Sequence, residues 1–113
     1  MTTITIDASL SGYLYGLNAT YSTARTTVFG DATYPVSVGQ YYGTNYYCYQ
    51  GFLQFNTSAL PDDATISSVT LKLYPQFDGS DTDFTINILG YDWGASLDLV
   101  DWRTPTQAAA LTN

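Results

Sequence analysis

The amino-acid sequence predicts an all-β, antiparallel fold, and three observations support this class. The 113-residue chain contains no glutamate and only one lysine, so it is poor in two residue types that favour helices. Its 17 threonines and 11 tyrosines suit the pleated, half-buried surface of a sheet. Apolar and polar residues alternate through Ser67–Tyr74, a pattern typical of antiparallel strands with one solvated face. We therefore expect one β-structured domain, residues 1–113.

The first half of the chain contains short extended segments that glycine or proline separates. In Thr2–Ile6, Ile4 and Ile6 share a face, which predicts a first strand. The further extended segments are Gly12–Gly16, Thr26–Phe29, which precedes a turn at Gly30-Asp31, and Tyr34–Gly39. Tyr41–Asn45 is expected to be a loop or a sheet edge.

The strongest predicted strands lie between Tyr46 and Tyr91. In Gly51–Phe55, Leu53 and Phe55 share one face. A polar connection follows, and the alternation then points Val69, Leu71 and Leu73 of Ser67–Tyr74, and Phe84, Ile86 and Ile88 of Asp83–Tyr91, toward the core. Ser96–Trp102 is compatible with one short helix and Gln107–Leu111 with a helical turn. We expect Trp93 and Trp102 to be core anchors.

The charge of the chain excludes several partners. Ten aspartates against three cations give a net charge of −7, and no basic face for phosphate contacts can be built from Arg25, Lys72 and Arg103. We therefore expect no nucleic-acid partner and no binding to an anionic membrane surface. No segment has the run of about 20 apolar residues that a membrane span needs. The start shows no basic region followed by an apolar stretch, so no secretory signal is expected.

The sequence contains no recognisable catalytic constellation. It has no histidine to activate Cys48, which we expect to be a buried small hydrophobe. Pairs of aspartates could serve glycoside hydrolysis, but they lie in predicted loops where turn chemistry explains them. We therefore expect a protein that is not an enzyme.

Two groups of residues remain as candidate sites. Asp78, Asp81 and Asp83 offer three carboxylates within six residues, the ligand type that calcium prefers, although their spacing is not that of an EF-hand loop. A plain acidic hairpin loop is the favoured explanation, and no other cofactor is expected. The second group is a tyrosine cluster within nine residues, Tyr41, Tyr42, Tyr46, Tyr47 and Tyr49. In a strand, Tyr47 and Tyr49 point to one face, and Tyr46 and Cys48 to the other. The cluster could form a subunit interface, core packing or a platform that stacks on sugar rings; the interface is our leading interpretation.

The segment Gly51–Tyr74, GFLQFNTSALPDDATISSVTLKLY, resembles a family signature. That signature has an aromatic and an apolar residue, Arg or Gln, Phe-Asp-Thr-Ser, Leu-Pro, and Ala-Thr-Ile-x-Ser-Ala-x-Leu-x-Leu-Tyr. It belongs to the DNRLRE-type jelly-roll domains, which are related to carbohydrate-binding modules and are similar to domains of phage structural and fibre-like proteins. Flanking residues around Tyr13, Tyr21 and Trp93 extend the resemblance over nearly the whole chain. One departure is Asn56, which stands where the family often has Asp.

The resemblance implies an antiparallel jelly-roll-like β-sandwich. The family module usually continues with further strands after its Trp region, so this chain would lack its closing strands. Three explanations stay open: a truncated chain, a short variant, or a subunit whose open edge a neighbour completes by strand addition. The leading hypothesis is a structural module of a virion or extracellular filament, as a homo-oligomer or on a larger protein scaffold. The alternative is a glycan-binding or adhesive module.

Overall fold

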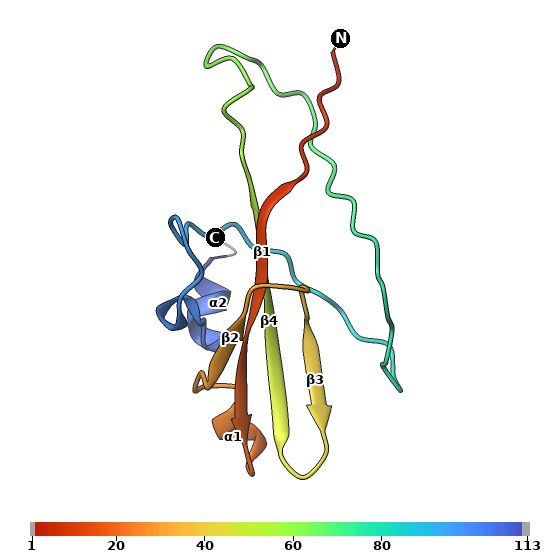
Figure 1. Cartoon of the computed structure of the whole chain (residues 1–113), viewed down its shortest axis with the longest axis vertical. Helices are drawn as coiled ribbons and strands as arrows, with labels where there is room; N and C mark the ends of the chain where they lie inside the picture. The colour runs from red at the N-terminus through yellow and green to blue at the C-terminus, as the bar shows by residue number, and fades with distance from the viewer. Residues whose placement is uncertain (1, 112–113) are drawn as a thin grey trace.

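One four-stranded antiparallel sheet forms the centre of the molecule (Figure 1). The computed structural model describes residues 2–111. The strands are β1 (Ala8–Asn18), β2 (Gly30–Ala32), β3 (Gly39–Tyr42) and β4 (Tyr46–Phe55), in the order β2-β1-β4-β3. The all-β prediction is therefore confirmed. The expected first strand at residues 2–6 is wrong, since β1 begins at Ala8, and the expected turn at Gly30-Asp31 lies inside β2.

The two longest strands, β1 and β4, pair with each other at the centre of the sheet. Its register runs from Ala8 opposite Phe55 to Asn18 opposite Tyr46, with an irregularity between Ala8 and Leu10. The two outer strands are much shorter: β2 pairs only with residues 13–15 of β1, and β3 only with residues 46–49 of β4. Within the described residues, the outer edges of 8–12 and 50–55 therefore have no strand partner.

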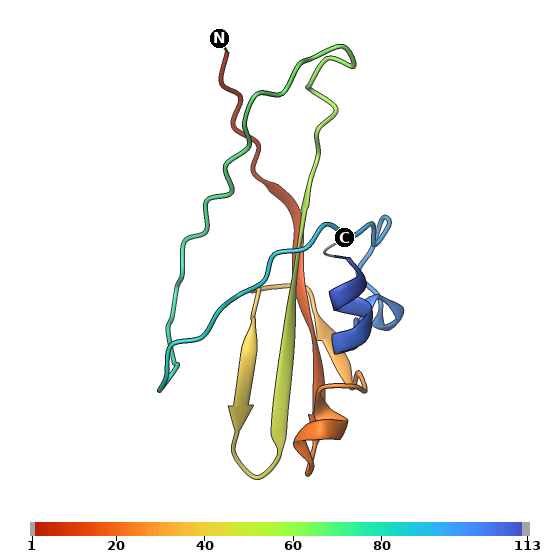
Figure 2. The same cartoon turned by 180° about the vertical axis from the view of Figure 1, so that it is seen from behind.

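The core lies on one face of this sheet, which we call the packed face. Leu14 of β1 is fully buried there, and Cys48 of β4 is 9% exposed. Ala24, from the one-turn helix α1 (Tyr21–Ala24), and Trp102 complete the buried cluster. Figure 2 shows the helices in front of this face. Gly16 allows α1 to lie against β1, because a Cβ at this position would overlap the carbonyl oxygen of Ala24.

The C-terminal segment covers the rest of the packed face through two polar anchors. The Gln50 side chain donates to the carbonyl of Arg103 at 2.6 Å and accepts from its N–H at 3.0 Å. Asp101, which is buried, accepts from the Tyr91 hydroxyl and from the Asp98 N–H, at 3.1 and 2.8 Å. These bonds satisfy polar groups that would otherwise be costly to bury.

Short helical turns surround these anchors. The 3₁₀ turn η1 (Leu99–Asp101) and helix α2 (Pro105–Ala110) confirm the short helical segments expected at the C-terminus, and each begins with a capping box. Trp102 is buried as expected, although its indole N–H has no hydrogen-bond partner in the described residues. Trp93 is only half-buried and packs edge-on against Phe52, with ring centroids 6.0 Å apart.

Residues 56–90, which we call the arm, form no helix or strand. In both views the arm runs along the β3 side of the sheet (Figures 1 and 2). Two of its side chains reach the rest of the chain: Gln76 donates to the Tyr34 hydroxyl at 3.4 Å, and the Phe84 ring lies close to Gly39 of β3. The predicted strands Ser67–Tyr74 and Asp83–Tyr91 are therefore wrong for this chain. Every residue from 61 to 88 is exposed, including all six side chains expected to point inward: Val69, Leu71, Leu73, Phe84, Ile86 and Ile88.

One reason is that both faces of the sheet are already partly covered by other segments of the chain. The packed face is already occupied by α1 and by the segment around Trp102. The opposite face is crossed by the connection between β2 and β3, since a Cβ at Gly51 would lie 2.9 Å from Cγ1 of Val38. The alternation in Ser67–Tyr74 indicates a strand, but a strand needs a neighbour to pair with. The sandwich of the family resemblance therefore stays a prediction.

Replacing Gly16 by alanine tests the close packing of α1 on β1. We expect Gly16→Ala to lower the free energy of unfolding by about 2 kcal/mol or more, because the added methyl group must displace backbone atoms of Ala24. Urea denaturation followed by tyrosine fluorescence measures this change. Gly90→Ala is the matched control, since a Cβ there meets nothing within 4 Å, and it should stay within about 0.5 kcal/mol of the parent chain. Equal stability of the two variants would contradict this account of the core.

Candidate functional site

The face of the sheet opposite the packed face carries an array of tyrosines, which we call the tyrosine face. Its members are Tyr13 and Tyr15 of β1, Tyr47 and Tyr49 of β4, and Tyr41 of β3. The strand register places Tyr15 opposite Tyr49 and Tyr41 opposite Tyr47. Because side chains alternate along a strand, all five project from the same side of the sheet. The array therefore follows directly from the register of three strands.

The rings of the tyrosine face contact one another along and across the strands. Tyr47 and Tyr49 stack with ring centroids 6.1 Å apart and planes within 10°. Tyr15 and Tyr49 lie 6.2 Å apart, and Tyr41 and Tyr47 5.9 Å apart. Tyr13 meets the edge of Tyr49 at 5.7 Å. These separations lie in the range where aromatic pairs attract each other, so the rings hold one another in place.

The structure divides the predicted tyrosine cluster between the two faces. Tyr47 and Tyr49 lie on the tyrosine face, as the alternation predicts, and Tyr41 of β3 joins them there. Tyr42 and Tyr46 are cross-strand partners on the other face, with centroids 4.5 Å apart, and Tyr21 of α1 lies 5.7 Å from Tyr46. Tyr13 and Tyr15 belong to the site but were missing from the predicted cluster. The i, i+2 spacing of these two residues was the available signal, but the pairing of β1 with β4 was not predictable from it.

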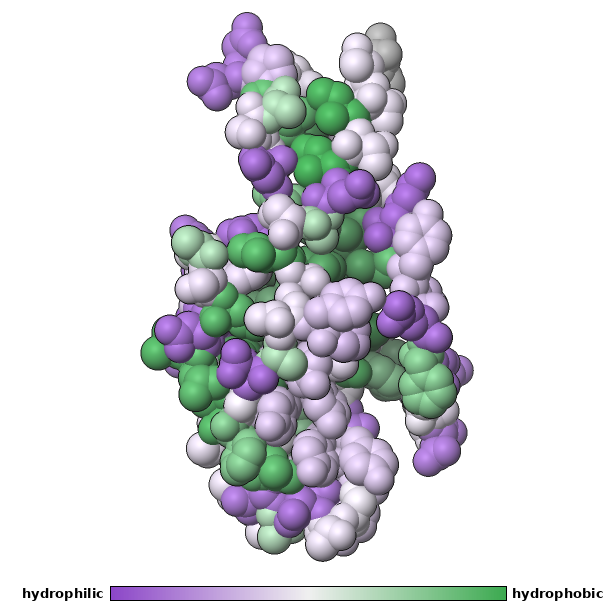
Figure 3. All heavy atoms as spheres, viewed as in Figure 1, coloured by the Kyte–Doolittle hydropathy of each residue, from purple (hydrophilic) through white to green (hydrophobic). Residues whose placement is uncertain are grey.

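The tyrosine face is hollowed at its centre. A shallow depression of about 290 Å³ is lined by Tyr13, Tyr15, Leu17, Asp31, Tyr47 and Tyr49. Figure 3 shows pale aromatic rings in the middle and lower right of the molecule, with strongly hydrophobic surface at the left and near the top. A wall of flat rings with hydroxyl tips and one carboxylate can stack on a planar apolar surface and donate hydrogen bonds at its margin. Such a surface suits the recognition of a flat partner or ligand.

Burial among these rings affects the ionisation of Tyr49. The pKa of the Tyr49 hydroxyl is raised above its ordinary value of 10.0, mainly because burial disfavours the phenolate. The neighbouring Tyr13 and Tyr47, and more weakly Tyr15 and Tyr41, raise the pKa further. The Tyr49 hydroxyl therefore stays protonated at neutral pH.

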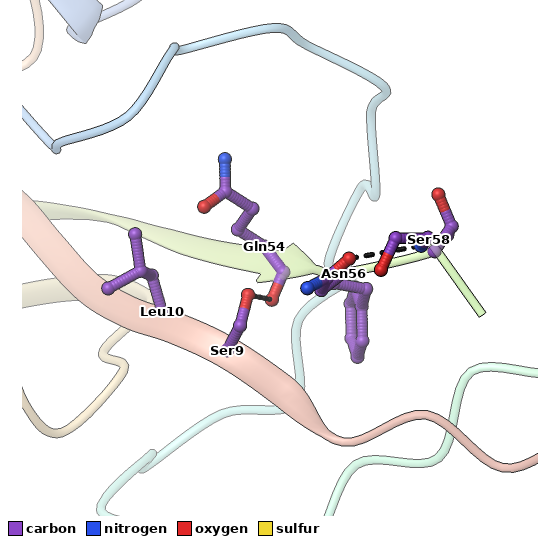
Figure 4. Close-up of a pocket in the computed structure, with 7 residues that line it drawn as sticks. Ser9, Leu10, Gln54, Asn56 and Ser58 are labelled. Atoms are coloured by element: carbon purple, nitrogen blue, oxygen red, sulfur yellow. Dashed lines mark hydrogen bonds between the residues drawn. The ribbon is translucent and has the colours of Figure 1, made fainter.

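A second hollow lies where β1 and β4 extend beyond the outer strands. It measures about 630 Å³ and is lined by residues 9–10 and 54–58 (Figure 4). The Ser9 hydroxyl donates to the Gln54 carbonyl at 3.1 Å, and the Asn56 side chain accepts from the Ser58 N–H at 3.0 Å. At this end of the sheet β1 and β4 pair only with each other, so the hollow lies beside the free outer edges of both strands.

The predicted calcium ligands Asp78, Asp81 and Asp83 all lie on the arm. Among the described residues, no three metal-ligating side chains are grouped closely enough to hold an ion. Asp78 accepts from both the hydroxyl and the N–H of Ser80, and these bonds hold the pKa of its carboxyl below the ordinary value. Calcium binding stays a prediction.

Cys48 is buried, as expected. Burial raises the pKa of its thiol, and the opposing effect of the Arg25 charge is smaller. The thiol is therefore held in its neutral, less nucleophilic form.

Comparisons with other proteins assign no family to this chain. No family model matches it, and comparisons with curated proteins and with solved structures give no match either. Within residues 2–111, no helix has the length and apolar character needed to cross a membrane.

The raised pKa of Tyr49 predicts how stability depends on pH. Because the folded state holds this proton more tightly than the unfolded chain, the contribution is complete below pH 10 and is lost as the pH rises through the higher folded pKa. We expect Tyr49→Phe to flatten the fall in unfolding free energy between about pH 9.5 and 11. Urea titrations at several pH values measure the slope. Tyr74→Phe, at an exposed arm position, should keep the parent slope; an equal slope for Tyr49→Phe and the parent chain would contradict the prediction.

Proposed function

We propose that this chain is a non-enzymatic structural module of a virion or extracellular filament, which assembles with copies of itself or with a larger scaffold. The observation that carries the proposal is the exposed surface of the arm. Its apolar side chains face solvent in the isolated chain, for example Val69 at 85% and Ile88 at 65% exposure. Contiguous exposed apolar surface of this kind is typical of protein–protein contacts.

The total surface of the chain supports the same proposal. A compact monomer of 12.4 kDa exposes about 6,100 Å², whereas this chain exposes 8832 Å². Its radius of gyration is 15.9 Å, compared with about 13 Å for a compact domain of this length. If two copies each buried this excess of about 2,700 Å², the contact would total about 5,400 Å², at the upper end of what permanent assemblies bury.

The composition determines what kind of contact can drive assembly. Copies that each carry a net charge of −7 repel one another, so charge opposes association. Burial of apolar and aromatic side chains must therefore supply the favourable free energy. Both the arm and the tyrosine face carry such side chains.

Light scattering of the purified chain over a range of concentrations tests the proposal. We expect a mass that is a multiple of 12.4 kDa, and we expect Val69→Lys with Ile88→Lys to shift the chain toward monomer, because lysines cannot be buried in an apolar contact. Ser68→Lys with Asn87→Lys adds the same charge at adjacent polar positions and should leave the assembly intact. A parent chain that stays monomeric at all concentrations would overturn the proposal.

The second candidate function is glycan binding, which the hollow of the tyrosine face favours. Sugar rings present apolar faces that stack on tyrosine, and Asp31 at the margin could accept hydrogen bonds from hydroxyls. If this candidate is correct, a glycan array should give hits that Tyr47→Ala abolishes. Tyr42→Ala, which removes an exposed tyrosine from the other face, should keep them. A monomeric chain with such hits would favour this function over assembly.

A further inference from the structure

We propose that the open edge of β4, residues 50–55, accepts the arm segment Ser67–Tyr74 of a second copy of this chain as an added strand. This inference rests on the proposed assembly function and names the surfaces that would form the contact. The open acceptor edge, the unpaired donor segment, the match of their side chains and their similar lengths support this contact.

The acceptor edge exists because β3 ends early. β4 has ten residues, and β3 pairs only with Tyr46–Tyr49. At Gly39 the chain adopts a positive φ of 118°, a conformation that favours glycine, and this is where the ladder stops. The chain preceding Gly39 crosses above Gly51, where Val36 and Val38 lie close to its Cα, and therefore does not continue alongside β4. Six residues of β4 are left without an outer partner.

The donor segment is extended but has no partner. Between residues 65 and 90, all of which the structure describes, only the Ser80 N–H among backbone groups makes a hydrogen bond. The backbone of Ser67–Tyr74 is therefore free to form a ladder. Free extended backbone and an open sheet edge are the two components of strand addition.

The side chains of donor and acceptor match on one face of the sheet. On the tyrosine-face side, β4 presents Leu53 and Phe55 beyond Gly51, and the crossing segment adds Val36 and Val38. Phe55, Val36 and Val38 are all more than a third exposed in the isolated chain. A strand added here with its apolar side inward would place Val69, Leu71 and Leu73 against this group. The polar residues of the donor, Ser68, Thr70 and Lys72, would then lie on the opposite side.

The length of the donor segment also fits the length of the open acceptor edge. The eight-residue donor spans the six open positions of the acceptor, and a strand of this length is common in sheets. The uncovered arm contributes to the excess surface of about 2,700 Å², and pairing of its segment Ser67–Tyr74 with a second copy would bury part of that excess. Each copy carries both an acceptor edge and a donor segment, so the contact can be reciprocal in a dimer or continue head to tail in a filament.

Proline substitutions in the donor test the inference. Thr70→Pro and Leu71→Pro are made separately, because one of these two adjacent N–H groups must face the acceptor in any register. Neither N–H is bonded in the isolated chain, so the fold of the sheet is unaffected. We expect at least one of the two variants to weaken association by about tenfold or more, as measured by light scattering and analytical ultracentrifugation. Thr85→Pro, in the other apolar stretch of the arm, is the matched control and should associate like the parent chain.

Hydrogen exchange on the parent chain provides the second readout. Raising the concentration should protect amides in residues 67–74 and the amides of 51–55 that β1 leaves unbonded. An oligomer that is insensitive to both donor prolines, or that Thr85→Pro alone disrupts, would overturn this inference and leave the assembly function standing. A monomer in which both segments are already protected would show that the chain pairs with its own arm, and would overturn both proposals.

Discussion

The antiparallel pairing of β1 with β4 is the constraint on which the rest of the structure depends. These strands are about forty residues apart in sequence, and their register from Ala8–Phe55 to Asn18–Tyr46 decides which side chains share a face. A shift of one residue would exchange the two faces, exposing Leu14 and Cys48 and burying the tyrosines. The buried core is small, so this register is held by the close approach of α1 to Gly16 and by the Gln50–Arg103 hydrogen bonds.

The same pairing produces both the packed face and the tyrosine face. One side of the two strands carries small or aliphatic residues that α1 and Trp102 can cover. The other side carries rings whose mutual contacts substitute for a second layer of secondary structure. The sheet therefore needs cover on only one side. Its tyrosine side stays available for another molecule, and the arm projects beside it.

The sequence predicted part of the fold and of the site from local patterns alone. The strand at Gly51–Phe55, the burial of Cys48 and Trp102, the opposite orientation of Tyr46 and Tyr47, and the C-terminal helical turns are confirmed. Each depends on alternation, composition or capping within a few residues. The strands at Ser67–Tyr74 and Asp83–Tyr91 have equally clear alternation, yet the chain leaves them unpaired. Local alternation shows which residues could share a face, but not whether a partner strand is available.

By itself, the sequence determined the all-β class, the opposite orientation of Tyr46 and Tyr47 in their strand, and the absence of a histidine or a basic surface. Only the tertiary structure decided that Tyr13 and Tyr15 join Tyr47 and Tyr49, that Tyr42 and Tyr46 lie on the other face, and that the arm stays uncovered. The physical reason is that strand pairing joins residues distant in sequence. Which strands pair depends on the edges and faces that remain free once the first pair has formed.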